Sequence, residues 1–513
     1  MQARETEPGK HAANPTQPAA RAADAAVLAG AVAATVLLAA AFVRSPAEAA
    51  AGLLVLALAA TLVLGRRRLA AVNVGHAAWW LVLLIPLTAL LGPAIAFPAF
   101  PQLFAFRVIT VAAAFLVVTL AIVVRPLPRY GAKVFVLLFA LWYGWLVVTL
   151  LWAPDVAEGL RYLGVMAFMY VVMAAMAAAG RNDRSLHALC WVLALGFVLI
   201  LGFSILEARL GIRMPTSRLL NGPLSQQYAL TSVFHNQNDL ATFIAISWPF
   251  VLTPLFLTRR LAWRLLSVSG IALALFALVH TGSRSSLLAI ALETLVLVIW
   301  FARLGARLDS RKGRIVGVTL AAILIAGASY LLFNNSDSAM LRQFRLEALL
   351  ANVQAGHGSG DTRITLAWRG LDAVGHFLLL GTGPGNAEVV LGSGLDALSL
   401  ANLHNWWLEV LVNGGLPAAF LQALIFFGLA AALWRVGKAD RDPLTSYLAI
   451  AAFAAFVGLL VAALGPSSAA GFAPMWVLWG LALAVVTRDD LRTEDAARPQ
   501  ALAASPDDRE PSL

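Results

Sequence analysis

The feature that most constrains this chain is a succession of windows, each about 20 residues long, that are almost entirely apolar and uncharged. A helix of about 20 such residues crosses the hydrocarbon core of a bilayer, which is ~30 Å thick. Charged residues make up only 12% of the chain, about half their share in an average soluble protein. So few charges could not cover the surface of a soluble protein of 513 residues. The sequence therefore predicts an all-α, polytopic membrane protein.

The apolar windows predict about fourteen transmembrane helices between two polar tails. Residues 1–23 and 488–513 are polar or rich in charge, alanine and proline, and we expect both tails to be disordered. Residues 24–333 would hold eleven helices, residues 404–487 would hold three, and residues 334–403 would form a long loop between them. The expected spans are 24–43, 48–65, 77–97, 107–124, 134–152, 162–180, 186–206, 239–258, 265–281, 285–302, 315–333, 404–434, 444–464 and 470–487.

The net charge of +10 could suggest a nucleic-acid-binding protein, but the distribution of the charges favours another explanation. If the N-terminus is cytoplasmic, 26 of the 37 lysines and arginines fall in the tails and loops on the cytoplasmic side. This is the asymmetry that the positive-inside rule describes for membrane proteins. The sequence thus predicts a multi-pass protein with both termini in the cytoplasm, and it predicts no nucleic-acid partner.

Two segments on the predicted outer side, 207–238 and 334–403, are too long to be simple connections. Loops of more than about 15 residues are usually functional or disordered. Within the second loop, residues 363–379 repeat apolar side chains at helical spacing, which predicts an amphipathic helix lying on the outer membrane boundary. The residues expected on its apolar face are Ile364, Ala367, Trp368, Leu371 and Val374.

His404 is the most informative residue of the second loop, because it opens the next predicted span beside two tryptophans. One interpretation is a boundary histidine in the lipid headgroup region. The other is a general base, since imidazole titrates near neutral pH. Glu409 would lie about 140° from His404 around a helix, at ~100° per residue. We therefore expect Glu409 to pair with Asn405 rather than to orient the imidazole.

Arg284 lies in the short break V-H-T-G-S-R-S-S-L-L between two predicted spans. An ionisable side chain at or just below the membrane boundary is a candidate for function. The alternative is that its guanidinium simply reaches toward headgroup phosphates.

A second polar group marks the start of the span expected at 239–258. Asn236, Asn238 and Asp239 are suited to capping the helix. Asn236 and Asn238 are also candidates for binding sugar hydroxyls. Arg218, upstream in the same outer segment, is a further substrate-binding candidate, although it could also belong to a solvated face.

Several kinds of chemistry have no pattern in this sequence. Cys190 is the only cysteine, which excludes an intramolecular disulfide and a cysteine-based metal site. We find no cluster of carboxylates suited to a divalent metal, no Walker loop, no H-E-x-x-H and no G-x-S-x-G. We therefore expect neither a metal nor a cofactor.

Several short motifs occur in a characteristic order and on the predicted outer side. They are L-L-W-A-P-D (150–155), S-V-F-H-N-Q-N-D-L-A (232–241), T-G-S-R-S-S (281–286), R-x-x-L-A-W (363–368), G-T-G-P-G (381–385) and H-N-W-W-L-E-x-L-x-N-G-G (404–415). In this arrangement the chain resembles the O-antigen ligase and O-antigen polymerase superfamily over roughly residues 134–480. These are bacterial multi-span glycosyltransferases.

The resemblance implies an active site on the extracytoplasmic face of the bacterial cytoplasmic membrane. Such enzymes take a glycan from an undecaprenyl-diphosphate carrier. Ligases pass it to a hydroxyl of a glycan or glycolipid acceptor, and polymerases pass it to a second lipid-linked chain. By position, His404 matches the essential histidine of the family, Arg284 its arginine between spans, and Arg363 the arginine that opens the loop helix. Arg369 and Asn405 are weaker, substrate-binding candidates.

The chemistry of these residues agrees with the resemblance. Arginines can stabilise the charge that develops on a leaving diphosphate without a metal ion, and His404 could accept the proton of the incoming hydroxyl. We expect a metal-independent, inverting transfer. The alternative of a different class is a transporter of lipid-linked glycans, which would also need many spans and arginines. The sequence shows no internal repeat of the kind common in transporters, and its polar groups gather at one face, which favours the enzyme.

Overall fold

The structure is a computed structural model, and it describes eleven stretches of the chain. These are residues 75–94, 96–97, 100–113, 132–220, 228–257, 260–304, 333, 359–392, 402–439, 442–466 and 470–503. The spans predicted at 24–43, 48–65 and 315–333 and the tail at 1–23 lie outside the described residues, as does most of the span predicted at 107–124. The loop predicted at 334–403 is described mainly from residue 359 to 392.

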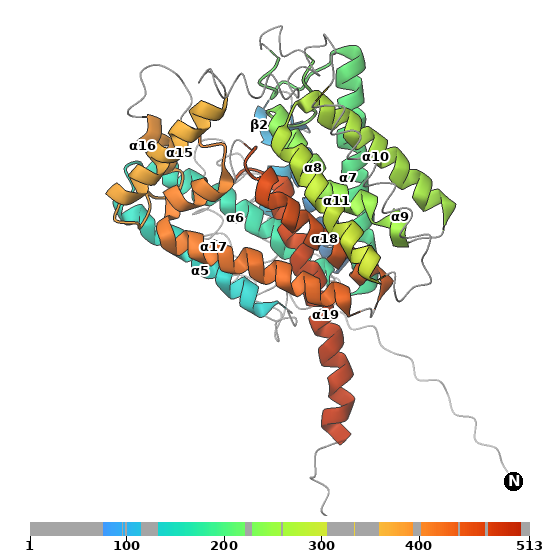
Figure 1. Cartoon of the computed structure of the whole chain (residues 1–513). Helices are drawn as coiled ribbons and strands as arrows, with labels where there is room; N and C mark the ends of the chain where they lie inside the picture. Colours follow the sequence, from blue (N-terminus) through green and yellow to red (C-terminus); the bar gives the residue numbers. More distant parts are fainter. Residues whose placement is uncertain are drawn as a thin grey trace, which may run out of the picture.

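The described chain is almost entirely helical (Figure 1). Its helices are α3 (Gly75–Leu91), a helix over 105–113, α5 (Lys133–Thr149), α6 (Val156–Ala179), α7 (Asp183–Leu210), α8 (Gln237–Leu252), α9 (Pro254–Leu257), α10 (Leu261–Thr281), α11 (Arg284–Leu304), α15 (Ser359–His376), α16 (Asn386–Gly392), α17 (Trp406–Lys438), α18 (Pro443–Ala462) and α19 (Ala473–Ala503). Two 3-10 turns, η1 (Gly92–Ala94) and η2 (Leu150–Trp152), follow α3 and α5. The fold is all-helical, as predicted, apart from one small antiparallel pair, β1 (Ala96–Phe97) and β2 (Phe100–Phe104).

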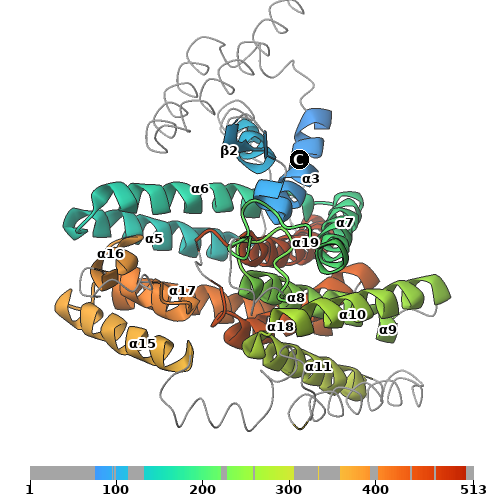
Figure 2. The ribbon, with the colours of Figure 1, turned by 90° about the horizontal axis from the view of Figure 1, so that it is seen from above.

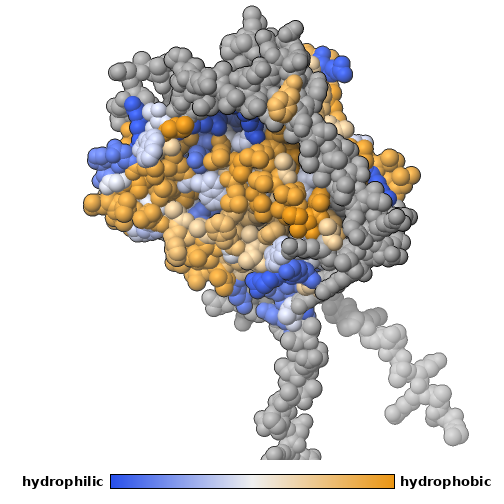
Figure 3. Space-filling view, in the orientation of Figure 1, coloured by the Kyte–Doolittle hydropathy of each residue, from blue (hydrophilic) through white to orange (hydrophobic). Residues whose placement is uncertain are grey.

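Seven of these helices are long and apolar enough to cross a membrane, so the chain is a multi-pass membrane protein. They are Lys133–Trp152, Val156–Ala179, Asp183–Leu210, Leu261–Thr281, Arg284–Ala302, Trp406–Lys438 and Pro443–Ala462. Each falls where the sequence predicts a span. The total of fourteen remains a prediction, because several expected spans lie outside the described residues. Figure 3 shows hydrophobic residues as a band across one face, with hydrophilic residues near both of its edges.

The bundle is centred on α8, α18 and the first half of α19 (473–487), whose side chains are mostly buried. Figure 2 shows α19 near the middle, with α6 and α7 on one side and α8, α17 and α18 on the other. Small residues allow this close packing. At Gly458 in α18, a Cβ atom would collide with the Glu293 carboxylate of α11, and at Gly180 it would collide with the backbone of Ala484 in α19.

The sequence predicted one continuous span at 404–434, but helix α17 is not straight. Gly415 has φ 68° and ψ −167°, which breaks the helix into a short arm, 406–414, and a longer span, 416–438. The rings of Trp407 and Phe426 are 5.0 Å apart. In a continuous helix those two residues would be about 28 Å apart along the axis, at 1.5 Å per residue. The arm therefore folds back against the span and returns toward the bundle.

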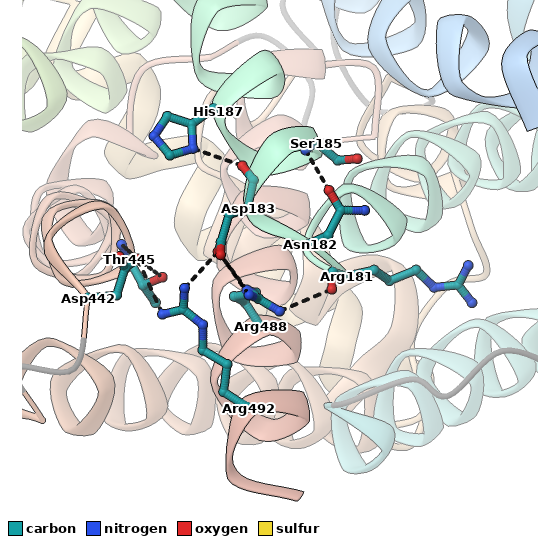
Figure 4. Close-up of polar contacts among 9 residues, drawn as sticks. All are labelled: Arg181, Asn182, Asp183, Ser185, His187, Asp442, Thr445, Arg488 and Arg492. Atoms are coloured by element: carbon teal, nitrogen blue, oxygen red, sulfur yellow. Dashed lines mark hydrogen bonds and ion pairs between the residues drawn. The ribbon is translucent and has the colours of Figure 1, made fainter. Parts of the chain in front are cut away.

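At the opposite end of the bundle, an ion-pair network joins α7, α18 and α19 (Figure 4). Arg488 donates two hydrogen bonds to the Asp183 carboxylate, at 2.8 and 2.9 Å. Arg492 pairs with Asp183 at 2.7 Å and with Asp442 at 3.3 Å. Arg488 and Arg492 lie within α19, which continues as a helix through Ala503. The sequence predicted a disordered tail from residue 488, so the structure differs from that prediction as far as residue 503. Residues 504–513 lie outside the described part of the chain.

Candidate functional site

The candidate site gathers the beginnings of α8 and α11, a residue of α15, and the segment before α17. Partial positive charge accumulates at helix N-termini, where unpaired N–H groups point outward. The N-termini of α8 and α11, which are far apart in the sequence, therefore both bring partial positive charge to this end of the bundle.

Arg284 is the first residue of α11, and its side chain is exposed. The turn before it is rigid. Gly282 ends α10 in the left-handed conformation, at φ 70°, and the Ser283 hydroxyl donates to the Ser286 hydroxyl at 3.2 Å. No hydrogen bond or ion pair joins the Arg284 guanidinium to another described residue.

Arg363 lies in the first half of α15 and points inward. Its Nη1 atom donates a hydrogen bond to the backbone oxygen of Leu464, just beyond the end of α18, at 3.2 Å. Burial lowers the pKa of Arg363, and the nearby charge of Arg284 lowers it further. The two guanidinium groups are therefore neighbours whose positive charges repel each other.

Arg218 approaches the same region from the loop before α8. Its Nε and Nη2 atoms both donate to the Oε1 atom of Gln237, at 3.1 and 2.8 Å. Burial lowers the pKa of Arg218, while the negative charge of Asp239 opposes this change. The arginine is thus held at the N-terminus of α8 by two residues of that helix.

The backbone of His404 is fixed in the left-handed region, at φ 45°, which is rare for residues other than glycine. Burial lowers the pKa of its imidazole, as do the nearby charges of Arg363 and Arg218, while the backbone carbonyl groups of Gly465 and Pro466 favour the protonated form. The Nδ1 atom is buried and has no hydrogen-bond partner among the described residues. The structure therefore places His404 where the charges of Arg363 and Arg218 both act on its imidazole.

The predicted asparagines take structural positions around this group. Asn236 is buried and caps α8, because its Oδ1 atom accepts from the backbone N–H groups of Asn238 and Asp239. Asn405 caps α17 by accepting from the N–H of Leu408. Asn238, half-buried, is in the first turn of α8.

The structure shows a contact of the Glu409 side chain with α6, and its predicted pairing with Asn405 stays a prediction. Glu409 accepts a hydrogen bond from the Tyr162 hydroxyl of α6, at 3.1 Å. Arg369 is exposed and lies about 120° around α15 from Arg363, so it faces away from the other arginines.

Helix α15 is found where the sequence predicts an amphipathic helix, but it has two apolar faces. Ile364, Trp368 and Leu371 are exposed, as expected of a face that meets a membrane. Val374 was assigned to that face, yet it is buried with Leu366 on the opposite side. The buried side chains join α16 and the arm of α17 in a small core separate from that of the main bundle. This satellite core consists of Leu366, Val374, Ala387, Leu391, Leu403, Leu408 and Val412.

The remaining motifs shape the backbone beside the site. Gly381, Gly383 and Gly385 all have positive φ values and approach neighbouring backbone closely. The N–H groups of Thr382 and Gly383 donate to the carbonyls of Val412 and Asn413 at 2.8 and 2.9 Å, just before the break in α17. The G-T-G-P-G turn therefore packs against the break in α17 and is joined to it by backbone hydrogen bonds.

The L-L-W-A-P-D motif lies in the connection between α5 and α6 and contacts the same glycine-rich turn. Trp152 donates to the carbonyl of Gly381 at 2.8 Å. The side chain of Asn386, at the start of α16, exchanges hydrogen bonds with the backbone of Asp155 at 2.7 and 3.0 Å. These two motifs thus contribute support rather than reactive groups.

Sequence reasoning missed Glu207, which holds the loop that carries Arg218. This carboxylate is buried near the end of α7 and accepts from the backbone N–H groups of Thr231 and Ser232, at 2.9 and 2.7 Å. An acidic residue inside an apolar run was the available signal. Within the described stretches, no group of three or more histidine, cysteine or acidic residues is placed to hold a metal ion.

Comparisons with known proteins cover this region. A family model described as O-antigen ligase matches residues 269–423, from α10 into α17. The chain is also 28% identical over 375 residues to the teichuronic acid biosynthesis protein TuaE of Bacillus subtilis (strain 168), an alignment that covers 69% of this chain and 72% of that protein. Arg284, Arg363 and His404 all lie within the matched family region.

Proposed function

We propose that this chain, which carries an O-antigen ligase family domain over residues 269–423, transfers a glycan from an undecaprenyl-diphosphate carrier to an acceptor hydroxyl on the extracytoplasmic face of the membrane. The observation that carries the proposal is that the charge of Arg363, on α15, acts both on the His404 imidazole and on the guanidinium of Arg284, at the start of α11. Like charges held together favour an anionic ligand, and a diphosphate offers several oxygens to such a pair.

In the proposed reaction, the acceptor oxygen attacks the anomeric carbon of the donor glycan. The hydroxyl proton passes to His404, and the bond between the anomeric carbon and the diphosphate oxygen breaks. Arg284 and Arg363 bind the diphosphate and stabilise the negative charge that it gains as it leaves. A single displacement of this kind inverts the anomeric configuration. Because guanidinium groups supply the charge stabilisation, the proposed transfer is independent of metal ions.

The tautomer of His404 follows from its surroundings. Backbone carbonyls only accept hydrogen bonds, so the ring nitrogen that faces Gly465 and Pro466 carries the proton. Since Nδ1 has no partner among the described residues, we assign that proton to Nε2. Nδ1 then holds the lone pair that accepts the proton of the acceptor, and because this atom is buried, the imidazole must turn to meet the incoming hydroxyl. The lowered pKa of His404 keeps this lone pair free at neutral pH.

The other candidates take secondary roles in the proposal. Arg218 adds a third positive charge beside His404, and Asn238 is placed to contact the glycan. Asn236 and Asn405 act through the helix starts that they cap. Arg369, exposed on α15, would meet only the periphery of a substrate.

The similarity to a teichuronic acid biosynthesis protein supports a role in the synthesis of a cell-surface polysaccharide. A polymerase of the same superfamily, which would use a second lipid-linked chain as acceptor, requires the same donor chemistry. A transporter of lipid-linked glycans remains the alternative of a different class. The imidazole beside the arginines favours an enzyme, because transport requires no proton acceptor at this point.

A reaction with purified protein, a lipid-diphosphate-linked glycan and an acceptor tests the proposal. We expect release of the lipid diphosphate that persists in EDTA and falls by more than about 100-fold in His404→Ala, as expected for the loss of a general base. Movement of the glycan across a vesicle membrane without bond cleavage would instead identify a transporter. Loss of activity in EDTA, restored by a divalent cation, would contradict the metal-independent mechanism.

Substitution of each arginine by lysine tests the two diphosphate contacts. Lysine keeps the charge but cannot form the planar, two-pronged contact of a guanidinium. Arg284→Lys and Arg363→Lys should each lower kcat/KM about tenfold or more, as expected for the loss of one charge-assisted hydrogen bond. Near-normal activity of both variants would remove the two arginines from the site.

A further inference from the structure

The residue two positions before the proposed base has both ends of its side chain engaged. The Oδ1 atom of Asn402 accepts a hydrogen bond from the backbone N–H of His404 at 2.8 Å. Its Nδ2 atom donates to the Oε1 atom of Glu388 in α16 at 2.7 Å. A continuous chain of hydrogen bonds therefore runs from a carboxylate on α16 to the backbone of His404.

The chemistry of this chain fixes its direction. A carboxylate can only accept hydrogen bonds, so Glu388 requires the NH₂ side of the Asn402 amide. The amide oxygen must then face His404, where it accepts from the N–H. This contact from a side chain to the N–H two residues later closes a local turn. The turn supports a backbone conformation, φ 45°, that histidine rarely adopts.

Glu388 is itself held in place by the support beside the site. At the start of α16, Asn386 is bonded to Asp155, and the N–H of Ala387 donates to the Oδ1 atom of Asn413 in the arm of α17, at 2.9 Å. The position of Glu388 therefore depends on the same framework that fixes the α17 break.

On this basis, and resting on the proposed function, we infer that Asn402 and Glu388 are positioning residues that hold His404 in its reactive orientation. Neither needs to touch the substrate. Their effect is exerted through the backbone of His404, which directs the imidazole toward Arg363 and Arg218.

The charged surroundings of the pair make the inference testable by pH. Glu388 is exposed, but neighbouring protein atoms still desolvate its carboxylate and raise its pKa. The hydrogen bond from Asn402 opposes this change, and the charge of Glu158 on α6 raises the pKa further. Arg161 pairs with Glu158 at 2.9 Å, and Glu409 of α17 lies nearby, hydrogen-bonded to Tyr162.

Exchanging the charged and the neutral side chain tests whether the direction of these hydrogen bonds matters, because the size of each side chain hardly changes. In Asn402→Asp, two carboxylates face each other and repel when both are ionised, so the His404 backbone loses its fixed partner. We expect kcat/KM to fall about tenfold or more below that of the wild type above neutral pH, as expected when a catalytic group is misplaced. At lower pH, where one carboxylate is protonated, the deficit relative to the wild type at the same pH should shrink. Glu388→Gln keeps an oxygen that accepts from Asn402, so its kcat/KM should fall less than that of Asn402→Asp, and its deficit should not depend on pH in this way.

The decisive variant is the double exchange Glu388→Gln with Asn402→Asp. The amide of the introduced glutamine would donate to one oxygen of the introduced aspartate, and the other oxygen would accept from the N–H of His404, so activity above neutral pH should return. Activity of Asn402→Asp equal to wild type at every pH, or no recovery in a folded double variant, would overturn the inference. His404→Ala is measured in parallel. If it stays fully active, the proposed base is wrong; if it is inactive while Asn402→Asp is unaffected, only the positioning role fails.

Discussion

The two arginines and the histidine have opposite electrostatic requirements that the site satisfies together. The arginines must remain charged to bind a diphosphate, whereas the base must remain neutral to accept a proton. Burial and the charges of Arg363 and Arg218 lower the pKa of His404 below its ordinary value of 6.5. Arg363, which in the proposal holds the anion, therefore also helps to keep the imidazole free of a proton.

This coupling predicts the pH dependence of the reaction. Activity should be lost as the pH falls through the pKa of His404, and the lowered pKa should carry activity to lower pH than an isolated histidine would. In Arg218→Gln, one of the charges that oppose protonation is removed, so the pKa of His404 should rise. The acid limb of kcat/KM should then move to higher pH.

The matched control for this prediction is Arg209→Gln, another exposed arginine, in the last turn of α7. Its acid limb should coincide with that of the wild type. An unchanged limb in Arg218→Gln would show that the guanidinium does not act on the imidazole.

At the scale of the elements, the break in α17 determines where the histidine lies. A straight helix would carry the arm away from the end of α18. Instead the arm folds back, and the N–H of Trp406 donates to the carbonyl of Ala463, the C-cap residue of α18, at 3.0 Å. The break depends on Gly415, where an added Cβ would collide with the carbonyl of Leu379.

Gly415→Ala should therefore destabilise the protein by about 3 kcal/mol or more, because strain and a backbone collision combine. Thermal unfolding in detergent would measure the loss. Gly375→Ala is the control, since a Cβ at Gly375, in the helical part of α15, meets nothing within 4 Å. A Gly415→Ala variant as stable as this control would contradict the importance of the break.

The exposed apolar face of α15 belongs to the same scale. We expect it to rest on the membrane, as apolar faces of interfacial helices do. In a Cys190→Ala background, an environment-sensitive fluorophore at Trp368→Cys should emit at shorter wavelength in vesicles than one at Arg369→Cys, because the exposed residue 369 lies about 100° or more around the helix from each residue of the apolar stripe. Equal emission from the two positions would place α15 away from the lipid.

At the scale of the whole molecule, the two ends of the bundle differ in charge chemistry. One end gathers mutually repelling cations and helix N-termini around His404. The other pairs its arginines, as Arg488 and Arg492 do with Asp183. With the positive-inside bias of the sequence, this predicts that the site faces out of the cell and that α19 ends in the cytoplasm.

Labelling of intact cells with a membrane-impermeant maleimide checks this orientation. In the Cys190→Ala background, a cysteine at Thr365 should react, whereas a cysteine at Glu494, exposed near the end of α19, should react only after the membrane is opened. The reverse pattern would direct the site toward the cytoplasm and remove the proposed donor from reach.

The sequence was informative about elements and about single residues, but less so about their assembly. Apolar windows predicted the described spans because the bilayer sets one length for all of them. The approach of Arg284 to Arg363 could not be read from the chain, because it depends on how α11 and α15 pack. The break in α17 had a local signal, G-G-L-P at 414–417, that the apolar pattern masked. The role of Asn402 had none, since an asparagine in a loop has many uses.

The site also lies where two separately packed units meet. His404 and Arg363 are adjacent to residues of the satellite core, whereas Arg284 and Arg218 belong to elements of the main bundle. A bound donor would contact both the satellite core and the main bundle and so link them, and a ligand that binds only the folded state raises its resistance to heat. Saturating donor should therefore raise the melting temperature even in His404→Ala, which separates binding of the donor from turnover.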